Sequence, residues 1–391
     1  MKTFSEVKFD IIIKTVFGLE EVLIGELKSL GIEKAEILNR AVQFRGNWRD
    51  VYNCNFNLRT ALRVLIPIEN FYAREPERIY KVASKIDWSE FMDLSQTFAI
   101  DSFAHSKYFT HAKYASLVVK DAISDQFTNR FGKRPSVDTD NPDVRINLHI
   151  SHDQCSLALD SSGDSLHKRG YRLEKNEAPL NEVLAAGMLI LSGWDKKIPF
   201  LDPMCGSGTI PIEAALLAKN YAPGLLKQNY GFSNWKNFDQ ELFSTIKEKA
   251  IAEINLKVPE IYGSDLDSES IDISVSNSKR AELNDLIQYE VKDFFTGESG
   301  DKKFHIVTNP PYGMRLQKDD IIKFYKGIGD TLKFNYPGSI AWVLSGNKEA
   351  FKFVGLRPSK KMKLFNGPLE CGFNQYQLYQ GSRKHSPDIQ D

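Results

Sequence analysis

Apolar and polar positions alternate with two different periods along the first 70 residues. Short runs such as VKFDIII and AVQFRG read as strands, whereas GLEEVLIGELKSLG has apolar positions every three or four residues and predicts a helix that ends at Gly31. The whole region predicts the order strand, helix, strand, strand, helix, strand. This order is the ferredoxin-like α+β pattern, which we expect to occupy residues 1–70.

A second α+β region follows at residues 71–160. It predicts a strand in QTFAIDSF, a long helix that ends at Gly132, and two alternating strands between Val144 and Asp160. The next segment is polar and rich in turn residues, so we expect residues 161–178 to be a linker.

From residue 179 to 391 short buried strands alternate with helices. This βαβα order predicts an α/β domain with a mostly parallel, doubly wound, Rossmann-like sheet. Near the end, Asn366-Gly367 separates two alternating runs, a strong β-hairpin signal. We therefore expect an antiparallel hairpin at one edge of the sheet.

Length and composition limit the possible classes of protein. A chain of 391 residues with 42% apolar residues is long enough for two or three packed domains. The 51 Lys and Arg balance the 51 Asp and Glu, so any nucleic-acid binding has to come from a local patch. The four cysteines show no C-x-x-C spacing, which favours reduced thiols and no metal site. Without a signal peptide or a membrane-length apolar run, we expect a soluble, cytoplasmic protein with no membrane partner.

The strongest local motif is FLDPMCGSGTIPIEAA, in which a strand ends at Asp202 and a glycine-rich turn leads into a helix. Small residues allow a ligand to lie against the backbone at the carboxyl edge of a doubly wound sheet. The motif lacks the lysine of a phosphate-binding P-loop and the spacing of a dinucleotide fingerprint. Our candidate cofactor residues here are Asp202, Pro203, Met204, Cys205, Gly206, Ser207, Gly208 and Thr209.

The next two predicted strands also end in acidic residues. One is followed by Asp265 and Leu266, where a ribose diol would lie, and the other by Asp293 and Phe294, which would take an amine and a flat ring. A positively charged nucleoside without phosphates fits this set, and S-adenosylmethionine is such a molecule. Each acidic residue taken alone is equally compatible with a turn or a helix cap.

Together, DPMCGSGT, GSDLD, VKDFF and NPPYGMRL resemble the motifs of class I S-adenosylmethionine-dependent amino-methyltransferases. SGDSLHKRGYR followed by APLNEVLAAGMLI resembles the THUMP-containing RNA methyltransferases, above all the N-terminal half of the bifunctional large-subunit ribosomal RNA guanine-N2 methyltransferases. The likeness covers nearly the whole chain, which ends before a second methyltransferase half could begin. It implies a seven-stranded class I methyltransferase domain at 179–391, preceded by ferredoxin-like and THUMP domains.

The resemblance assigns roles to the corner Asn309-Pro310-Pro311-Tyr312, which ends a buried strand. In the family pattern the side-chain oxygen of Asn309 and the carbonyl of Pro310 accept hydrogen bonds from the target amine, and Asn309 also borders the cofactor. Pro310 and Pro311 fix the backbone, and Tyr312 offers the base a stacking face. Without the glycine-rich loop, the same four residues would read as a simple turn. His305, inside the preceding apolar run, is expected to be a core histidine.

Between Asp101 and Arg134 six basic residues outnumber three aspartates, and aromatic residues are interspersed among them. From charge alone this is an ordinary solvated helix face, but the resemblance to THUMP domains implies contacts with structured RNA. Our candidate RNA-binding residues are Lys107, Lys113, Lys133 and Arg134.

The combined expectation is methyl transfer to an exocyclic amine of ribosomal RNA, with N2 of guanine in the large subunit as the acceptor. One alternative is an adenine-N6 methyltransferase acting on RNA or DNA. A glutamine-methylating enzyme shares the NPPY corner but not the RNA-binding front half. The alternative from another class is a non-catalytic RNA-binding factor in ribosome assembly.

Overall fold

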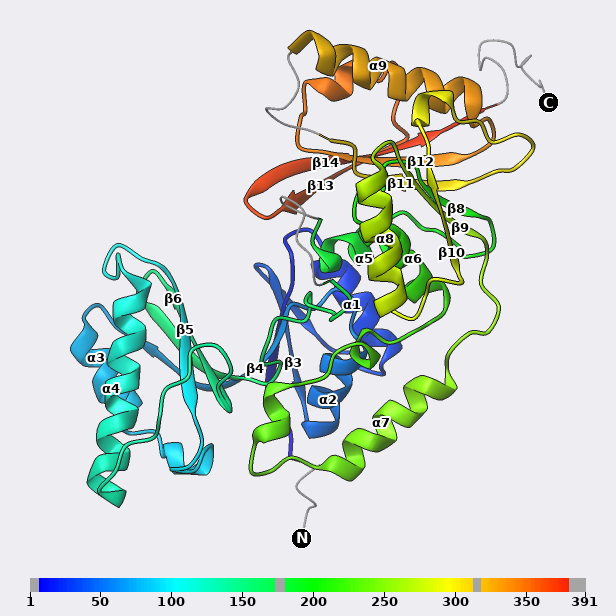
Figure 1. The fold of residues 1–391 in the computed structure, drawn as a ribbon. Helices are drawn as coiled ribbons and strands as arrows, with labels where there is room; N and C mark the ends of the chain where they lie inside the picture. Colours follow the sequence, from blue (N-terminus) through cyan, green and yellow to red (C-terminus); the bar gives the residue numbers. More distant parts are fainter. Residues whose placement is uncertain (1–6, 173–179, 312–317, 380–391) are drawn as a thin grey trace, which may run out of the picture. The chain divides into compact units, whose positions relative to one another are not determined.

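The computed structural model describes residues 7–172, 180–311 and 318–379 (Figure 1). The chain folds into two compact units. The N-terminal unit consists of Met1–Thr15, Leu23–Leu166 and Lys227–Lys249, and the C-terminal unit of Val16–Val22, His167–Leu226 and Ala250–Asp391. In the part of the chain that the structure describes, no helix is long and apolar enough to cross a membrane.

The N-terminal unit is built on one seven-stranded sheet with the order β2-β3-β1-β4-β7-β6-β5. Its strands are β1 (Phe9–Lys14), β2 (Glu36–Leu38), β3 (Ala41–Gly46), β4 (Arg63–Tyr72), β5 (Phe98–His105), β6 (Val144–Ser151) and β7 (Gln154–Asp160). The helices of this part of the chain are α1 (Glu20–Ser29), α2 (Trp48–Asn57), α3 (Pro76–Ala83) and α4 (Ala112–Phe131). Gly132 ends α4 in the left-handed conformation (φ 69°), which glycine adopts without steric cost.

Strands β1 to β4 with α1 and α2 have the predicted ferredoxin-like order, and β1 pairs antiparallel with both β3 and β4. The sequence did not show that β4 also pairs antiparallel with β7, so that one sheet runs through both predicted α+β regions. Strand β4 can serve both because it is ten residues long, and a bulge between Pro67 and Glu69 shifts its register on β7.

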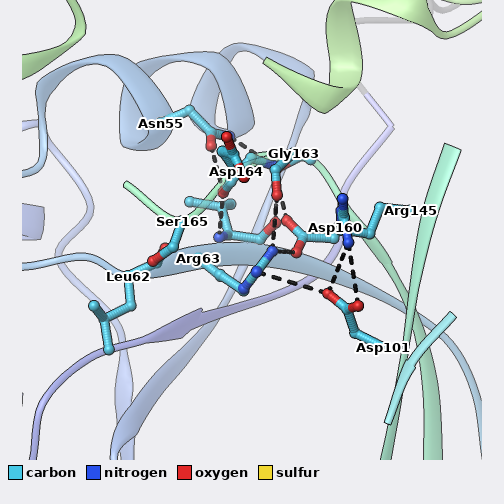
Figure 2. A network of polar contacts seen from close by, with 12 residues as sticks. Asn55, Leu62, Arg63, Asp101, Arg145, Asp160, Gly163, Asp164 and Ser165 are labelled. Atoms are coloured by element: carbon cyan, nitrogen blue, oxygen red, sulfur yellow. Dashed lines mark hydrogen bonds and ion pairs between the residues drawn. The ribbon is translucent and has the colours of Figure 1, made fainter. Parts of the chain in front are cut away.

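Residues 161–166, which we expected to begin a polar linker, pack in the N-terminal unit, where Ser161, Ser162 and Leu166 are buried (Figure 2). The Arg63 guanidinium forms an ion pair with the buried Asp160 carboxylate and donates to the Gly163 carbonyl at 2.8 Å. The hydroxyl of Ser162 donates to Asn55 Oδ1 on α2 at 2.7 Å. These contacts satisfy polar groups that would otherwise be costly to bury.

Residues 227–249, which we assigned with the methyltransferase domain, pack instead in the N-terminal unit. The ring of Tyr52 on α2 lies 4.7 Å from that of Phe232, 5.9 Å from Phe238 and 6.0 Å from Phe243, measured between centroids. The Tyr52 hydroxyl also accepts a hydrogen bond from the Asp239 N–H at 3.1 Å. The sequence signal is the aromatic run YGFSNWKNFDQELF, whose rings need a partner surface.

The C-terminal unit contains a second seven-stranded sheet with the order β10-β9-β8-β11-β12-β14-β13. Its strands are β8 (Phe200–Asp202), β9 (Ile261–Asp265), β10 (Ile287–Val291), β11 (His305–Thr308), β12 (Ile340–Ser345), β13 (Lys360–Asn366) and β14 (Leu369–Gln377). Its helices are α5 (Glu182–Leu191), α6 (Thr209–Ala218), α8 (Ser268–Arg280) and α9 (Lys318–Asn335). Helix α7 (Gln240–Ala252) lies mostly in the N-terminal unit, and only its end from Ala250 belongs to the C-terminal unit.

Strands β8 to β12 are parallel and β14 runs antiparallel to both β12 and β13, as predicted. Asn366 pairs with Leu369, so the β13–β14 hairpin turns through two residues, and Gly367 has the positive φ (61°) that such a turn requires. The side chains of Ile306, Ala341 and Val343 form part of a buried core that fixes the central strands.

Candidate active site

The ends of β8, β9 and β11 bring the candidate cofactor and acceptor residues to one edge of the sheet. Strand β8 lies between the other two: Asp202 pairs with Gly263 on β9, and Leu201 with Ile306 on β11. Because all three strands are parallel, the residues that follow them leave the sheet at the same carboxyl edge. Strands β8 and β11 are neighbours in the sheet but not in the sequence, because the chain forms β9 and β10 on one side of β8 before it returns to form β11 on the other side. This reversal is the switch point at which doubly wound sheets bind ligands.

The glycine-rich loop after β8 is held by backbone and side-chain contacts from β9 and α8. The Cys205 N–H donates to the Ser264 carbonyl at 2.9 Å and the Gly206 N–H to Asp265 Oδ2 at 2.8 Å. From α8, the Ser274 hydroxyl donates to the Gly206 carbonyl at 2.6 Å, and Asn277 Nδ2 to the Ser207 carbonyl at 2.9 Å. The loop is therefore preorganised.

Two glycines of this loop have different structural roles. Gly208 has φ 80°, and a Cβ atom there would lie 2.8 Å from the Tyr289 hydroxyl and 3.0 Å from Ser274, so only glycine fits. Gly206 also has a positive φ (53°), but a Cβ on it would meet no atom of the described structure within 4 Å. The backbone at Gly206 therefore borders open space, which is the room a ligand needs for close approach.

Asp202 is almost completely buried, and its Oδ1 accepts a hydrogen bond from the Met204 N–H at 3.2 Å. Burial, with a smaller contribution from the negative charge of Asp265, raises the pKa of Asp202 to about 7. A cation placed against this carboxyl would favour its ionised form. Cys205 is also buried, and burial raises the pKa of its thiol, which argues against a nucleophilic role.

Asp265 is the last residue of β9 and Leu266 follows it, so both lie at the strand end, as predicted. One oxygen of Asp265 holds Gly206 and the other accepts from the Asp267 N–H at 3.1 Å, while Leu266 is 71% exposed. The helix-capping role that we left open for these acids belongs to Asp267, whose oxygens accept from the first N–H groups of α8.

The third strand end differs from the expectation for Phe294. This ring is 5% exposed and stacks against Tyr336 in the core at 5.8 Å between centroids, so it presents no free face to a ligand. Asp293 Oδ1 accepts from the Phe295 N–H at 2.9 Å and caps a short 3₁₀ turn. The neighbouring Phe295 is the ring that reaches the surface. Phe294 comes three places after the end of β10, and the turn there directs its ring into the core, which the periodicity of the sequence does not show.

The acceptor corner follows β11. Asn309 Oδ1 is buried and has no hydrogen-bond partner among the described residues. This acceptor therefore receives a hydrogen bond neither from these residues nor from solvent. Pro310 is buried and Pro311 exposed; Tyr312 lies outside the described residues. His305 is a core histidine, as predicted: its Nε2 lies 2.8 Å from the Ser192 hydroxyl, and burial lowers its pKa to about 4.

A buried polar cluster that we did not predict supports the start of α6. Arg169 forms an ion pair with Glu213 at 3.3 Å, with both side chains almost completely buried, and the Tyr171 hydroxyl donates to Glu213 at 3.2 Å. Arg172 donates to the hydroxyl of Thr209, the first residue of α6. A single glutamate in the apolar helix sequence TIPIEAALLA was the available signal, because a buried carboxylate needs a partner.

The four candidate RNA-binding residues do not form one patch. Lys107 and Lys113 flank the start of α4, whereas Lys133 and Arg134 follow its end. A helix of 20 residues is about 30 Å long, so the two pairs lie far apart. Lys107 Nζ lies 5.1 Å from the centroid of the Tyr108 ring. Among the described residues, no three His, Cys, Asp or Glu side chains gather in a way that could hold a metal ion.

The strand order of the C-terminal sheet, its antiparallel final hairpin and the loop after the central strand define a class I methyltransferase fold. The chain belongs to the family described as the RMKL-like methyltransferase domain, which matches residues 169–375. The THUMP domain matches residues 73–160, and the RlmL ferredoxin-like domain residues 10–65.

The curated relatives include proteins about twice as long as this chain and one of similar length. The ribosomal RNA large subunit methyltransferase K/L of Syntrophotalea carbinolica is 39% identical over 90% of this chain, and that of Methylococcus capsulatus 40% over 90%. The chain spans about half of these relatives, 51% and 49% of their length. A Synechocystis protein that carries the name of an RNA methyltransferase, slr0064, is 38% identical, and the match covers 93% of this chain and 95% of that protein.

Solved structures share the whole architecture. The methyltransferase SMU.472, crystallised with S-adenosylhomocysteine, has a TM-score of 0.86 and 27% identity over 96% of this chain and 99% of its own. A protein of Clostridium difficile 630 described as a possible methylase has a TM-score of 0.85 and 31% identity over 96% and 100% of the two chains.

Proposed function

We propose that this chain transfers a methyl group from S-adenosylmethionine to an exocyclic amine of a base in large-subunit ribosomal RNA, with N2 of guanine as the acceptor. The observation that carries the proposal is the buried Asn309 Oδ1, which has no hydrogen-bond partner among the described residues and follows β11, the strand that pairs with β8 and so neighbours its loop. A lone buried acceptor is costly unless a ligand supplies the donor, and the N–H of an exocyclic amine is such a donor.

The cofactor side of the proposal is supported by the shape and charge of the loop. S-adenosylmethionine carries an activated methyl group on a sulfonium, an ammonium and a ribose diol. The open space at Gly206 would admit the cofactor against the backbone. Asp202 would face its cationic part, and Asp265 its hydroxyl groups. The cofactor product bound in SMU.472, whose fold this chain shares, supports the same choice.

The acceptor side requires positioning rather than a strong base. The lone pair of an exocyclic amine is delocalised into the ring, so the amine has to be held with that lone pair directed at the methyl group. Asn309 Oδ1 and the Pro310 carbonyl would accept from its two N–H groups. Proline fixes φ, so little conformational entropy is lost when the amine binds. The proton leaves only after methyl transfer, which explains why no histidine or lysine need flank the corner.

RNA as the substrate is supported by the THUMP domain and by the names of the relatives. We place RNA contacts in the N-terminal unit and the reacting base, flipped out of its helix, at the acceptor corner. The domain limits 1–70, 71–160 and 179–391 remain part of this proposal, with residues 227–249 packed in the N-terminal unit.

The deciding experiment is mass spectrometry of nucleosides from ribosomal RNA of cells with and without this protein, repeated on purified large-subunit RNA with S-adenosylmethionine. The expected result is N2-methylguanosine that depends on the protein. N6-methyladenosine instead would support the second candidate, which one structural neighbour favours: a Listeria monocytogenes protein described as a predicted N6-adenine-specific DNA methylase has a TM-score of 0.84 and 28% identity. A chain that binds RNA but gives no heat of binding with S-adenosylmethionine would be an assembly factor.

A further inference from the structure

Two cross-strand rows of side chains lie on the half of the N-terminal sheet formed by β5, β6, β7 and β4. In the first row Phe103 pairs with His149, His149 with Ser156, and Ser156 with Asn70. In the second row, two residues further along β5, His105 pairs with Ser151, Ser151 with Gln154, and Gln154 with Tyr72. Paired residues, and residues two apart in one strand, share a face of the sheet. All eight side chains therefore lie on the same face.

The opposite face of these strands is closed by α4. Leu148 and Ile150, which alternate with the row residues on β6, are completely buried. The hydroxyl of Ser102, next to Phe103 in β5, donates to the carbonyl of Ala112 at the start of α4 at 2.7 Å. The rows thus lie on the face away from α4, and Phe103 and Tyr72 are 61% and 66% exposed there.

The two rings of the first row are stacked, with their planes nearly parallel. Phe103 and His149 are 5.7 Å apart between centroids, and their planes are inclined by only 6°. Burial, with a smaller contribution from the Lys14 ammonium, lowers the pKa of His149 below its ordinary value, which favours the neutral imidazole. His149 is only partly exposed, whereas Phe103 is 61% exposed, so Phe103 is the ring of the pair that is available to a third ring.

The groups around these rings are polar rather than apolar. Gln154 Nε2 donates to the Tyr72 hydroxyl at 3.3 Å, and the amide of Asn70 is exposed. Lys107 and Arg74 lie 5.1 and 5.5 Å from the Tyr108 ring centroid, beyond the end of β5, and Arg74 also forms an ion pair with Asp153 at 2.9 Å. The nearest acid on β5, Asp101, is bound by Arg145 at 3.1 Å. The core of a protein–protein interface would be more apolar.

We propose that these two rows form a stacking platform for unpaired bases of the RNA substrate, with a base on the exposed face of Phe103. Sheets with exposed aromatic residues bind single-stranded RNA in this way in other folds, and amide groups between the rings can read base edges. Lys107, at the end of the rows, would contact a phosphate. This inference rests on the proposed function, because it takes RNA as the substrate.

The test is the affinity of the full chain for a short fluorescent, unpaired oligoribonucleotide, measured by anisotropy without cofactor. Phe103→Ala should weaken binding about five- to 150-fold, the range for loss of one base–aromatic stack. Phe103→Tyr should retain binding because the ring remains. The salt dependence should not change, since Phe103 contacts no phosphate. Phe334→Ala is the matched control. This phenylalanine lies on α9, is 67% exposed, which is close to the 61% of Phe103, and has Lys333 beside its ring.

Each outcome separates this inference from the proposed function. The platform is supported if Phe103→Ala binds unpaired RNA more weakly than wild type and Phe334→Ala does not. In that case the wild type should also methylate ribosomal RNA. Equal affinity of Phe103→Ala and wild type overturns it and leaves the rows as a surface for another protein, while the proposed methyl transfer stands. Equal weakening toward a fully paired duplex also overturns it, because a stack requires an unpaired base. If the wild type does not methylate ribosomal RNA at all, that result contradicts the proposed function and not the platform.

Discussion

Asn309 is the residue at which the proposed chemistry is most directly tested. Asn309→Ala removes the buried acceptor and leaves the loop of Gly206 unchanged. We expect turnover to fall about 100-fold or more, by analogy with the removal of one preorganised polar group from a transition-state site. Binding of S-adenosylmethionine, measured by calorimetry, should stay within a few-fold of wild type. Asn284→Ala, which alters an exposed amide, is the control, and equal loss of binding and turnover would show that Asn309 holds the cofactor instead.

Asp202 should make cofactor binding depend on pH. Its pKa in the fold is about 7, raised mainly by burial, so the carboxyl is largely protonated below pH 7 in the absence of ligand. A cation binds the ionised form, so below pH 7 binding has to be accompanied by proton release. The affinity for S-adenosylmethionine should therefore rise by up to tenfold per pH unit between pH 5.5 and 7 and level off above pH 8. Asp202→Asn should bind weakly with no such rise, and a wild-type affinity that is flat over this range would contradict the assignment.

The same shift predicts how Asp202 affects the stability of the ligand-free protein. The folded-state pKa is raised above the ordinary value of 3.8, so the fold binds the proton more tightly than the unfolded chain does. The contribution of Asp202 to the free energy of unfolding is therefore fully present below pH 3.8, and it is lost as the pH rises toward 7. Asp202→Asn should accordingly raise the melting temperature at pH 8 more than at pH 5. A uniform effect at both pH values would indicate a packing change instead of titration.

At the scale of elements, the buried pair Arg169–Glu213 joins the segment before α5 to the helix that follows the cofactor loop. Arg169→Met leaves Glu213 charged and buried, and should cost about 3–5 kcal/mol. The double variant Arg169→Met, Glu213→Leu should recover most of that loss, since apolar residues of similar size often replace a buried ion pair. Denaturant unfolding of the single and double variants measures this coupling, and additive losses would contradict it.

How far the sequence predicted these elements depends on the range of the signal. Strands β8, β9, β10 and β11 were predicted because each is a short apolar run that ends in a chemically distinctive motif. The pairing of β4 with β7 was not predicted, because register between distant strands leaves no local pattern. Nor was the packing of residues 161–166 in the N-terminal unit, since a serine-rich turn has the same composition whether it is solvated or hydrogen-bonded to α2. The site residues Asp202 and Asp265 were placed correctly at their strand ends, whereas the burial of Phe294 required the packing of Tyr336.

On the scale of the whole molecule, each of the two units is formed by segments that are not consecutive in the sequence. Val16–Val22 belong to the C-terminal unit and Lys227–Lys249 to the N-terminal unit. The two units are therefore not separable by one cut in the chain, although the family matches divide it into consecutive domains. A truncation that removes residues 1–160 takes away Tyr52, the partner of three phenylalanine rings in the segment that remains.

We therefore expect the chain 161–391 to aggregate and to bind a hydrophobic dye, because Phe232, Phe238 and Phe243 lose the surface that buries them. Replacing these three residues by serine in the same truncation should reduce dye binding and aggregation, and this variant is the matched control. Equal aggregation of both chains would show that other surfaces are responsible. Loss of RNA affinity in the simple truncation would not identify the RNA-binding unit, because misfolding has the same effect. The full-length variant Lys107→Glu tests whether the N-terminal unit binds RNA without disturbing the fold. The slope of its RNA affinity against salt concentration should fall by the equivalent of about one phosphate contact.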